Sequence, residues 1–456
     1  MKGVPVRSFV AALAILALGA LPALAGPPVP DPGAPGPFLA GHTSFVLSDP
    51  GRSGAPDFEF RPIPVEVWYP VDAADVTGAT PEAVYPLDIL YGYAPDTVSS
   101  DWEKYGIDRA WQEPPPSAGR PFPLVVFSPG WGAPAWWHMS VGTRLASHGF
   151  VVAVMYHYGD WWWAWEPFDH LAVASWNRPR DASFVLTDLL AKNEGGSGHL
   201  LSGTIRPDEV AASGWSLGGY ASMTLAAGDD SVCDTLYGYF PEDPPAWTCS
   251  PSAADPRIRA IVPLDGSNQA LHFDELARVE VPALGIGEEW TELALDPPFA
   301  SWQARQHAAF SGRPAYRADV FDTNHQSFSD ACESLGVLED KGIISAEEAA
   351  FLRSVLCDGY LPSGEAHRLT TKYMIAFLKT NLSGEPGYQN VLTPGYALTR
   401  EPAVEFFVTE KRSPASIFDD WPPDFIYFMH QPGSEQARAR KDPPSPLRIP
   451  RATQKR

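Results

Sequence analysis

The hexapeptide Gly214-Trp215-Ser216-Leu217-Gly218-Gly219 constrains the fold of this chain more than any other stretch. It follows EVAAS, a run typical of a buried strand, and precedes YASMTLAAG, a run typical of a helix. In a strand-turn-helix of this kind the serine occupies a tight turn, and glycines two positions before and after it let strand and helix pass closely. The motif predicts a nucleophile elbow with Ser216 as the nucleophile; a serine in an ordinary turn is the alternative.

Between residues 59 and 410, short apolar runs alternate with helical patterns. This alternation favours an α/β fold with a mostly parallel central sheet and helices on both faces. The expected strands are 64–70, 123–129, 150–157, 209–213, 257–265, 281–289 and 315–323. The expected helices are 140–149, 180–193, a segment from Leu217 and 366–381.

Both ends of the chain differ in composition from this catalytic domain. Residues 1–25 place two basic residues before an apolar run that ends in Ala23-Leu24-Ala25, the pattern of a cleaved signal peptide. A Pro/Gly-rich N-terminal segment, 26–58, is expected to be extended over its first part. Residues 411–456 form a C-terminal extension with a basic, disordered tail. We therefore expect a secreted or periplasmic protein.

The charge of the chain argues against nucleic acid as a partner. The formal net charge is −22, and it becomes −24 when the leader takes Lys2 and Arg7 away. Such a surface repels nucleic acid and anionic lipid. No later segment is apolar enough to span a membrane, and the sequence does not indicate an oligomeric state.

Four cysteines suit an exported protein with two disulfides. Three pairings are possible, and the local one, Cys233–Cys249 with Cys332–Cys357, closes the shortest loops. None of the four lies in a Cys/His metal spacing, so no metal site is expected.

A serine nucleophile needs a histidine to take its proton and a carboxylate to orient that histidine. Chains with this elbow carry the partners in the order serine, acid, histidine. Five histidines follow Ser216, and only His325 lies on a loop after an expected strand; the others are His272, His307, His367 and His430.

The acid has more than one candidate. Asp265 ends one expected strand, and Glu288 and Glu289 end the next. The pattern alone does not choose between them, and a helix-capping role is a further reading of Asp265.

The oxyanion of an acyl-transfer intermediate needs two backbone N–H donors. Leu217, directly after the serine, is expected to supply one. The glycine-containing loop after strand 123–129 is expected to supply the other through Trp131.

Tryptophans crowd two loops that are expected to overhang the site, 131–138 and 158–170. They suit an apolar ester pocket, and capping of the core is an equal alternative. The tentative substrate-binding residues are Trp136, Trp137, Trp162 and Trp215.

These segments resemble the platelet-activating-factor acetylhydrolase branch of the α/β-hydrolases, near the dienelactone hydrolases and cutinase-like polyesterases. The likeness rests on VEVWYP, LVVFSPGWGA, LASHGFVVAV, GWSLGG, IVPLDG and HQSFSD. It implies Ser216 as nucleophile, Asp265 as acid and His325 as base, with Trp131 and Leu217 as the oxyanion hole. The chain departs from the family at Trp215 and Pro129, where the family often has histidine, and a segment at about 229–256 resembles an insertion that could form a lid.

The sequence thus predicts an exported serine hydrolase of short-chain or lipid-like carboxylic esters that needs no metal or organic cofactor. Two alternatives remain open: a cutinase-like polyester hydrolase, and a catalytically silent binding protein with the same fold.

Overall fold

The computed structural model describes residues 29–52, 59–87, 95–160, 171–230, 232–233, 245–267, 271–289 and 302–409 of the 456-residue chain. The predicted signal peptide and the basic tail lie outside these residues. Within the described ranges, no helix combines the length and the apolar character that a membrane crossing needs.

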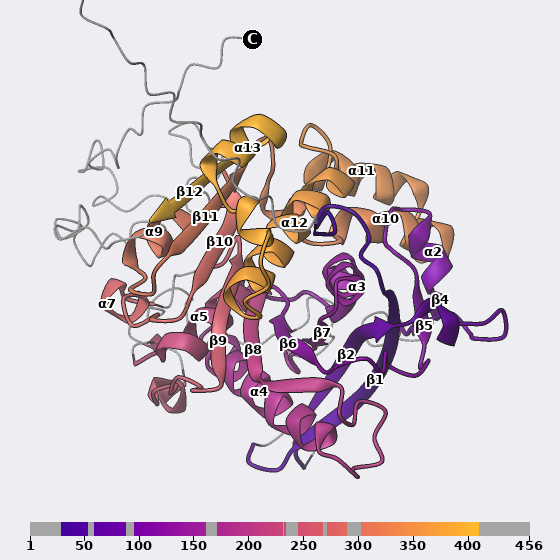
Figure 1. Cartoon of the computed structure of the whole chain (residues 1–456), viewed down its shortest axis with the longest axis horizontal. Coiled ribbons are helices and arrows are strands. Elements are labelled where there is room, and N and C mark those ends of the chain that lie inside the picture. Colours follow the sequence, from indigo (N-terminus) through magenta and orange to yellow (C-terminus); the bar gives the residue numbers. More distant parts are fainter. Residues whose placement is uncertain are drawn as a thin grey trace, which may run out of the picture.

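Most strands belong to one large sheet (Figure 1). Its strands are β1 (Leu39–Asp49), β2 (Arg61–Val71), β5 (Ala110–Gln112), β6 (Phe122–Ser128), β7 (Val151–Met155), β8 (Ile205–Trp215), β9 (Ile258–Leu264), β10 (Ala283–Glu288), β11 (Ala315–Val320) and β12 (Val404–Thr409). They lie in the order β12-β11-β10-β9-β8-β6-β7-β2-β1-β5. A separate small ladder pairs β3 (Val84–Tyr85) with β4 (Thr97–Val98).

The centre of the sheet is parallel. The strands from β11 to β7 pair in parallel, and β12 and β2 flank them antiparallel. The carboxyl ends of the parallel strands therefore share one edge, where ligand sites of open α/β sheets form. This agrees with the mostly parallel α/β architecture that the alternating pattern predicts.

Helices cover both faces of this sheet (Figure 1). The α-helices are α2 (Ser99–Glu103), α3 (Met139–Ser147), α4 (Leu171–Asn193), α5 (Leu217–Ala227), α7 (Phe273–Leu276), α9 (Trp302–Ala309), α10 (Ala331–Asp340), α11 (Ala346–Leu356), α12 (Ser363–Asn381) and α13 (Pro394–Arg400). Short 3-10 turns are η1 (Ala73–Asp75), η2 (Ala135–His138), η3 (Ala246–Cys249), η4 (His325–Phe328) and η5 (Tyr388–Asn390).

The two faces of the sheet build two cores. Along β6, Val125 and Phe127 pack into the core under α3 and α12, while Leu124 and Val126 pack into the core under α4 and α5. Successive side chains of a strand point to opposite faces, and every residue of β6 is buried. A continuous apolar run is what a parallel strand covered on both faces requires.

The sheet begins earlier than the sequence pattern indicates. Strand β1 lies inside the N-terminal segment 26–58, which the sequence analysis kept apart from the catalytic domain, and pairs along its whole length with β2. Its sequence, LAGHTSFVLSD, mixes polar and apolar residues without a clear period of two. Pairing with β2 therefore decides its conformation, and the domain starts about where β1 does.

Helix α4 is also longer than expected. The apolar pattern predicted a helix from residue 180, but α4 begins at Leu171 and carries Pro179 inside it. Proline lacks an N–H group and crowds the carbonyl four residues earlier, so a helix is not expected to run through it. The flanking Arg178 and Asp181 are fully buried and hydrogen-bonded, and these contacts hold the helix on both sides of the proline.

Candidate active site

Ser216 lies in the turn between β8 and α5 with φ 56° and ψ −122°. Non-glycine residues seldom adopt positive φ, at a cost of roughly 1–3 kcal/mol. A Cβ at Gly218 would lie 1.8 Å from the carbonyl oxygen of Ser128, and one at Gly214 would lie 2.4 Å from the carbonyl carbon of Gly218. The glycines therefore allow the close crossing of strand and helix, and Ser216 has the backbone geometry of the predicted elbow.

Asp265 and His325 meet next to this turn. Asp265 follows β9 with φ 40°, is fully buried, and its Oδ2 is hydrogen-bonded to His325 Nδ1. The His325 side chain is 18% exposed, so its ring is in contact with solvent while its partner is not. The Trp215 ring lies 4.8 Å from the His325 ring, and its Nε1 donates to the His325 carbonyl oxygen at 2.9 Å. The Trp215 indole thus holds the loop that carries His325 through a ring contact and a backbone hydrogen bond.

Glu288, the alternative acid, lies close by. One carboxylate oxygen each of Asp265 and Glu288 and one ring nitrogen of His325 all lie within 4.8 Å of one another, and Glu288 is 8% exposed. The carboxylate hydrogen-bonded to Nδ1 of the imidazole is that of Asp265. Glu289 instead donates its backbone N–H to Val320. The geometry therefore favours Asp265 as the partner of His325.

The loop after β6 packs directly against the nucleophile. A Cβ on Gly130 would lie 3.3 Å from Ser216 Cβ and 2.4 Å from Trp215 Cε3. Trp131, the next residue, is partly buried. Leu217 opens α5, where the first N–H groups of a helix have no partner within the helix. The two expected oxyanion donors thus come from segments that adjoin Ser216 on both sides.

A second hydrogen-bonded series of serine, histidine and aspartate lies behind this loop, and it was not predicted from the sequence. Ser128 Oγ is 2.8 Å from His157 Nε2, and His157 Nδ1 is 2.8 Å from Asp181 Oδ2. All three side chains are at most 2% exposed. Ser128 ends a regular strand and also accepts from Arg178 Nη1 at 3.1 Å. A substrate does not reach a buried hydroxyl, so Ser216 remains the candidate nucleophile. The buried Ser-His-Asp series instead supports the loop after β6.

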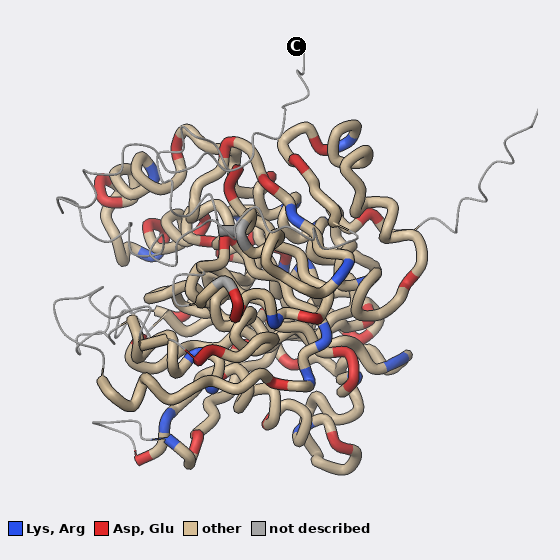
Figure 2. The backbone as a smooth tube through the Cα atoms, turned by 90° about the vertical axis from the view of Figure 1, so that its left-hand side faces the viewer, with Lys and Arg blue, Asp and Glu red and all other residues tan. Residues whose placement is uncertain are grey.

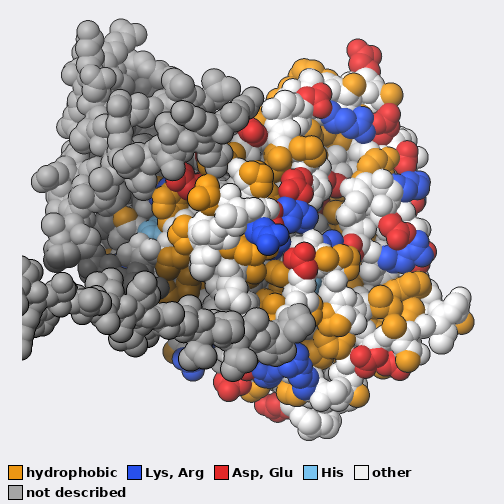
Figure 3. All heavy atoms as spheres, turned by 45° about the horizontal axis from the view of Figure 1, so that its top comes forward, with side chains coloured by type: hydrophobic (Ala, Val, Ile, Leu, Met, Phe, Trp, Pro, Cys, Tyr) orange, Lys and Arg blue, Asp and Glu red, His pale blue; other side chains and the backbone are white. Residues whose placement is uncertain are grey.

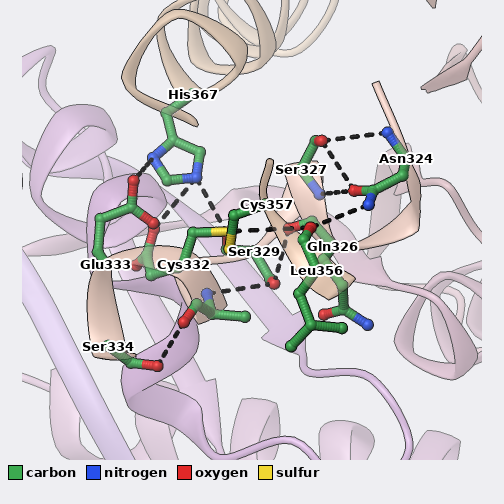
Figure 4. The surroundings of a disulfide bond; sticks show 12 residues. Asn324, Gln326, Ser327, Ser329, Cys332, Glu333, Ser334, Leu356, Cys357 and His367 are labelled. Carbon is green, nitrogen blue, oxygen red and sulfur yellow. Dashed lines mark hydrogen bonds and ion pairs between the residues drawn. A yellow bond between two sulfur atoms is a disulfide. The ribbon is translucent and has the colours of Figure 1, made fainter. Parts of the chain in front are cut away.

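The loop that carries His325 is tied to α11 (Figure 4). Asn324 Nδ2 donates to the Leu356 carbonyl at 2.9 Å, and Asn324 Oδ1 accepts from the Ser327 N–H at 3.1 Å, which caps η4. The disulfide Cys332–Cys357 joins the start of α10 to the end of α11. The second disulfide is Cys233–Cys249, so both pairs are the local ones.

Removing the disulfide beside the histidine loop is expected to destabilise the protein. The double change Cys332→Ala/Cys357→Ala should lower the free energy of unfolding by about 3 kcal/mol, because the open chain regains loop entropy in the unfolded state. Urea unfolding followed by tryptophan fluorescence measures this loss. Cys233→Ala/Cys249→Ala is the matched control, because it removes a disulfide that is not attached to the histidine loop. Equal stability of the first double variant and the wild type would contradict the expectation.

Another acid–histidine cluster lies next to this disulfide (Figure 4). Donor atoms of Asp330, Glu333 and His367 are within 4.8 Å of one another and all three residues are buried. Burial lowers the pKa of His367, but Glu333 and Asp330 raise it overall. His367 Nε2 also lies 3.1 Å from the Ser329 carbonyl, so that nitrogen carries a proton. His367 Nε2 lies 3.6 Å from Asp330 Oδ1 and Nδ1 lies 3.8 Å from Glu333 Oε1, so the three groups form a buried acid–histidine network beside the disulfide.

The tryptophans of the site separate into different environments. Trp136 is fully buried and packs at 5.5 Å on Trp102, so it belongs to the core, and its expected contact with substrate stays a prediction. Trp215 is 3% exposed and packs on His325. Trp137 is partly buried, 6.3 Å from the Trp215 ring. Trp162 lies outside the described residues.

Comparisons with known proteins agree with this fold. A family model described as platelet-activating factor acetylhydrolase, isoform II, matches residues 103–161, which include β6, the loop after it and β7. The structure of a ferulic acid esterase from Streptomyces cinnamoneus superposes with a TM-score of 0.55 at 21% identity, covering 82% of this chain and 97% of that one. The fold is that of an α/β-hydrolase. No curated protein sequence matches the chain significantly.

Four buried residues near the loop after β6 were not predicted from the sequence. Arg178, Asp160, His157 and Asp181 all lie behind the loop after β6, yet none belongs to a local motif. Asp160 lies in the second tryptophan loop, 18 positions before Arg178. The signal that could have found them is the presence of Asp160, Arg178 and Asp181 close to the apolar, tryptophan-rich stretch 161–165.

His138, in the core of the domain, gives a pH prediction. Burial, with smaller effects of His367 and Arg178, lowers its pKa to about 3, and neither ring nitrogen has a hydrogen-bond partner among the described residues. The unfolded state therefore takes up a proton below pH 6.5 that the folded state does not, so stability falls as pH falls through that range. His138→Phe removes this proton, and its ring suits neighbours Phe127 and Trp215.

Relative to the wild type, His138→Phe should gain about 2 kcal/mol of unfolding free energy between pH 8 and pH 5. Chemical unfolding at several pH values measures the difference. A constant difference across this range would mean that His138 is protonated in the folded state.

Proposed function

We propose that this protein is an exported serine carboxylic-ester hydrolase that acts through an acyl-enzyme intermediate on Ser216. The observation that carries the proposal is the strained elbow at Ser216 beside the hydrogen-bonded pair of Asp265 and His325. The match to the acetylhydrolase family model and the likeness to a ferulic acid esterase support an ester as the substrate. A silent binding protein has no need to keep this strain together with the acid–histidine pair.

In the proposed reaction Ser216 Oγ attacks the ester carbonyl carbon while His325 takes the serine proton. Asp265 holds the imidazole tautomer and stabilises the imidazolium. The N–H groups of Leu217 and Trp131 donate hydrogen bonds to the carbonyl oxygen, on which negative charge develops. His325 then returns the proton to the leaving alcohol, and a water activated by His325 hydrolyses the acyl-serine.

The proposed substrates are short-chain or lipid-like esters. Partly buried indoles of Trp131 and Trp137 near the site favour an apolar acyl or alkyl group. Basic positions are scattered among acidic ones in the view of Figure 2. A polyanionic ligand needs a cluster of basic side chains, so this distribution does not favour one. Two disulfides suit an oxidising compartment and so support export.

A polyester surface is the second candidate substrate, because large apolar side chains are exposed near the histidine loop. Hydrophobic and charged side chains alternate on the face shown in Figure 3. On α11, which binds the histidine loop, Phe351 is 65% and Val355 is 56% exposed. Such side chains could rest on a polymer.

Hydrolysis rates on p-nitrophenyl esters of increasing acyl length, on methyl ferulate and on a polyester film test the proposal. The acyl-enzyme proposal expects turnover of soluble short esters, with a decline as the acyl chain outgrows the pocket. Absence of turnover on every ester by the folded protein would refute it, and turnover confined to the film would select the second candidate.

A further inference from the structure

We propose that Arg178 is a positioning residue for the reaction: from behind the loop after β6 it holds the carbonyl groups of Pro129 and Gly130, and thereby aims the Trp131 N–H at the oxyanion. The inference rests on the proposed function and adds a residue that lies on a different element from every member of the candidate triad. Arg178 lies on α4 and is fully buried.

The guanidinium of Arg178 binds the loop with both of its arms. Nη2 donates to the Gly130 carbonyl at 2.8 Å, and Nη1 donates to the Pro129 carbonyl. Nε donates to Asp160 Oδ2 at 2.7 Å. The other carboxylate oxygen of Asp160 accepts from the Gly132 N–H at 2.9 Å. Arginine and aspartate together thus hold Pro129, Gly130 and Gly132, which lie on both sides of Trp131.

The direction of the Trp131 N–H follows from the planarity of the peptide bond. The Gly130 carbonyl and the Trp131 N–H belong to one trans peptide group, so they point in opposite directions. Arg178 binds the carbonyl, together with the Ala133 N–H at 3.0 Å, and the Trp131 N–H therefore points away from Arg178. A Cβ built on Gly130 would lie 3.3 Å from Ser216 Cβ, so this peptide group borders the nucleophile.

The chemistry of arginine is needed for this arrangement. A planar guanidinium presents several donors in a fixed fork, whereas a lysine ammonium is a compact point charge. A buried ion pair contributes little to stability compared with apolar residues of the same size. Arg178 and Asp160 are therefore better explained by the loop atoms that they fix than by their mutual attraction.

Arg178→Lys in the full chain tests the proposal. We expect kcat on a p-nitrophenyl ester to fall about 100-fold, as for loss of one oxyanion donor. KM should change less than about threefold, because the ground-state carbonyl gains little from the hole. The affinity for an alkyl boronic acid, which forms a tetrahedral adduct with the serine, should fall in parallel with kcat.

Arg144→Lys is the matched control. Arg144 also bridges a carboxylate and a backbone carbonyl, with Nε at 2.6 Å from Asp108 Oδ2 and Nη1 at 3.2 Å from the Gly33 carbonyl. It lies outside the site, so kcat should stay within about threefold of the wild type. Circular dichroism and thermal unfolding check that both variants fold.

If Arg178→Lys does not fold, Asp160→Asn gives the second measurement. It keeps Arg178 but replaces the carboxylate that holds the Gly132 N–H, and kcat should fall about 10-fold with KM nearly unchanged. A folded variant at either position with wild-type kcat and boronate affinity would overturn the inference. An equal loss in Arg144→Lys would do the same. A wild type without turnover and without a fluorophosphonate adduct on Ser216 would instead refute the proposed function.

Discussion

Ser216→Ala is expected to lower kcat by roughly 10⁵- to 10⁶-fold, because the acyl-enzyme cannot form without the hydroxyl. The substitution removes one oxygen at a position whose neighbours, Gly214 and Gly218, keep the turn open. The protein should therefore fold as before. Hydrolysis of a p-nitrophenyl ester and labelling by a fluorophosphonate, followed by peptide mapping, measure the loss.

Ser213→Ala is the matched control for this substitution. Ser213 lies on β8, the strand that leads into Ser216. It is buried and donates to the Val262 carbonyl at 2.6 Å, so its substitution removes a hydrogen bond without changing the proposed nucleophile. Labelling also separates the two Ser-His-Asp chains: Ser128→Ala should still carry its adduct on Ser216. Retained turnover in Ser216→Ala would rule out the elbow as the reaction centre, and an adduct on Ser128 would move the centre to the buried chain.

Asp265→Asn is expected to lower kcat by about 10⁴-fold. An amide at this position can donate to His325 Nδ1, which places the imidazole proton on the wrong nitrogen. The backbone should tolerate the change, because asparagine, like aspartate, adopts positive φ more readily than other side chains, and Asp265 has φ 40°. Steady-state kinetics of the folded variant give the value.

Glu288→Gln and Glu289→Gln are the controls for the acid. Glu288 ends β10 and Glu289 follows it. A carboxylate oxygen of Glu288 lies within 4.8 Å of a ring nitrogen of His325, but the carboxylate hydrogen-bonded to Nδ1 is that of Asp265. We expect losses of less than about 10-fold. A greater loss in Glu288→Gln than in Asp265→Asn would assign the acid to β10 and would reverse our interpretation.

The local features of this site could be predicted from the sequence. Gly214, Ser216 and Gly218 fix a turn through contacts of neighbouring residues, so the elbow is visible as a motif. The central strands appear as apolar runs because both faces of the sheet are covered. The two disulfides join cysteines 16 and 25 positions apart, and short separations favour local pairing.

The remaining features required the tertiary structure. Asp265 and Glu288 both follow central strands, and only the placement of a loop 60 positions further on decides which carboxylate bonds to His325. Trp136 and Trp137 are adjacent and chemically identical, yet one is core and the other borders the site.

Arg178 illustrates the physical limit. The sequence pattern does not assign Arg178 to a face of a helix, because Pro179 argues against a helix at this point. The packing of α4 in the folded domain overrides that local preference. Sequence determines conformation where the interactions are between neighbours along the chain. Hydrogen bonds between distant segments depend on positions within tenths of an ångström, and those positions are set by the packing of the whole domain.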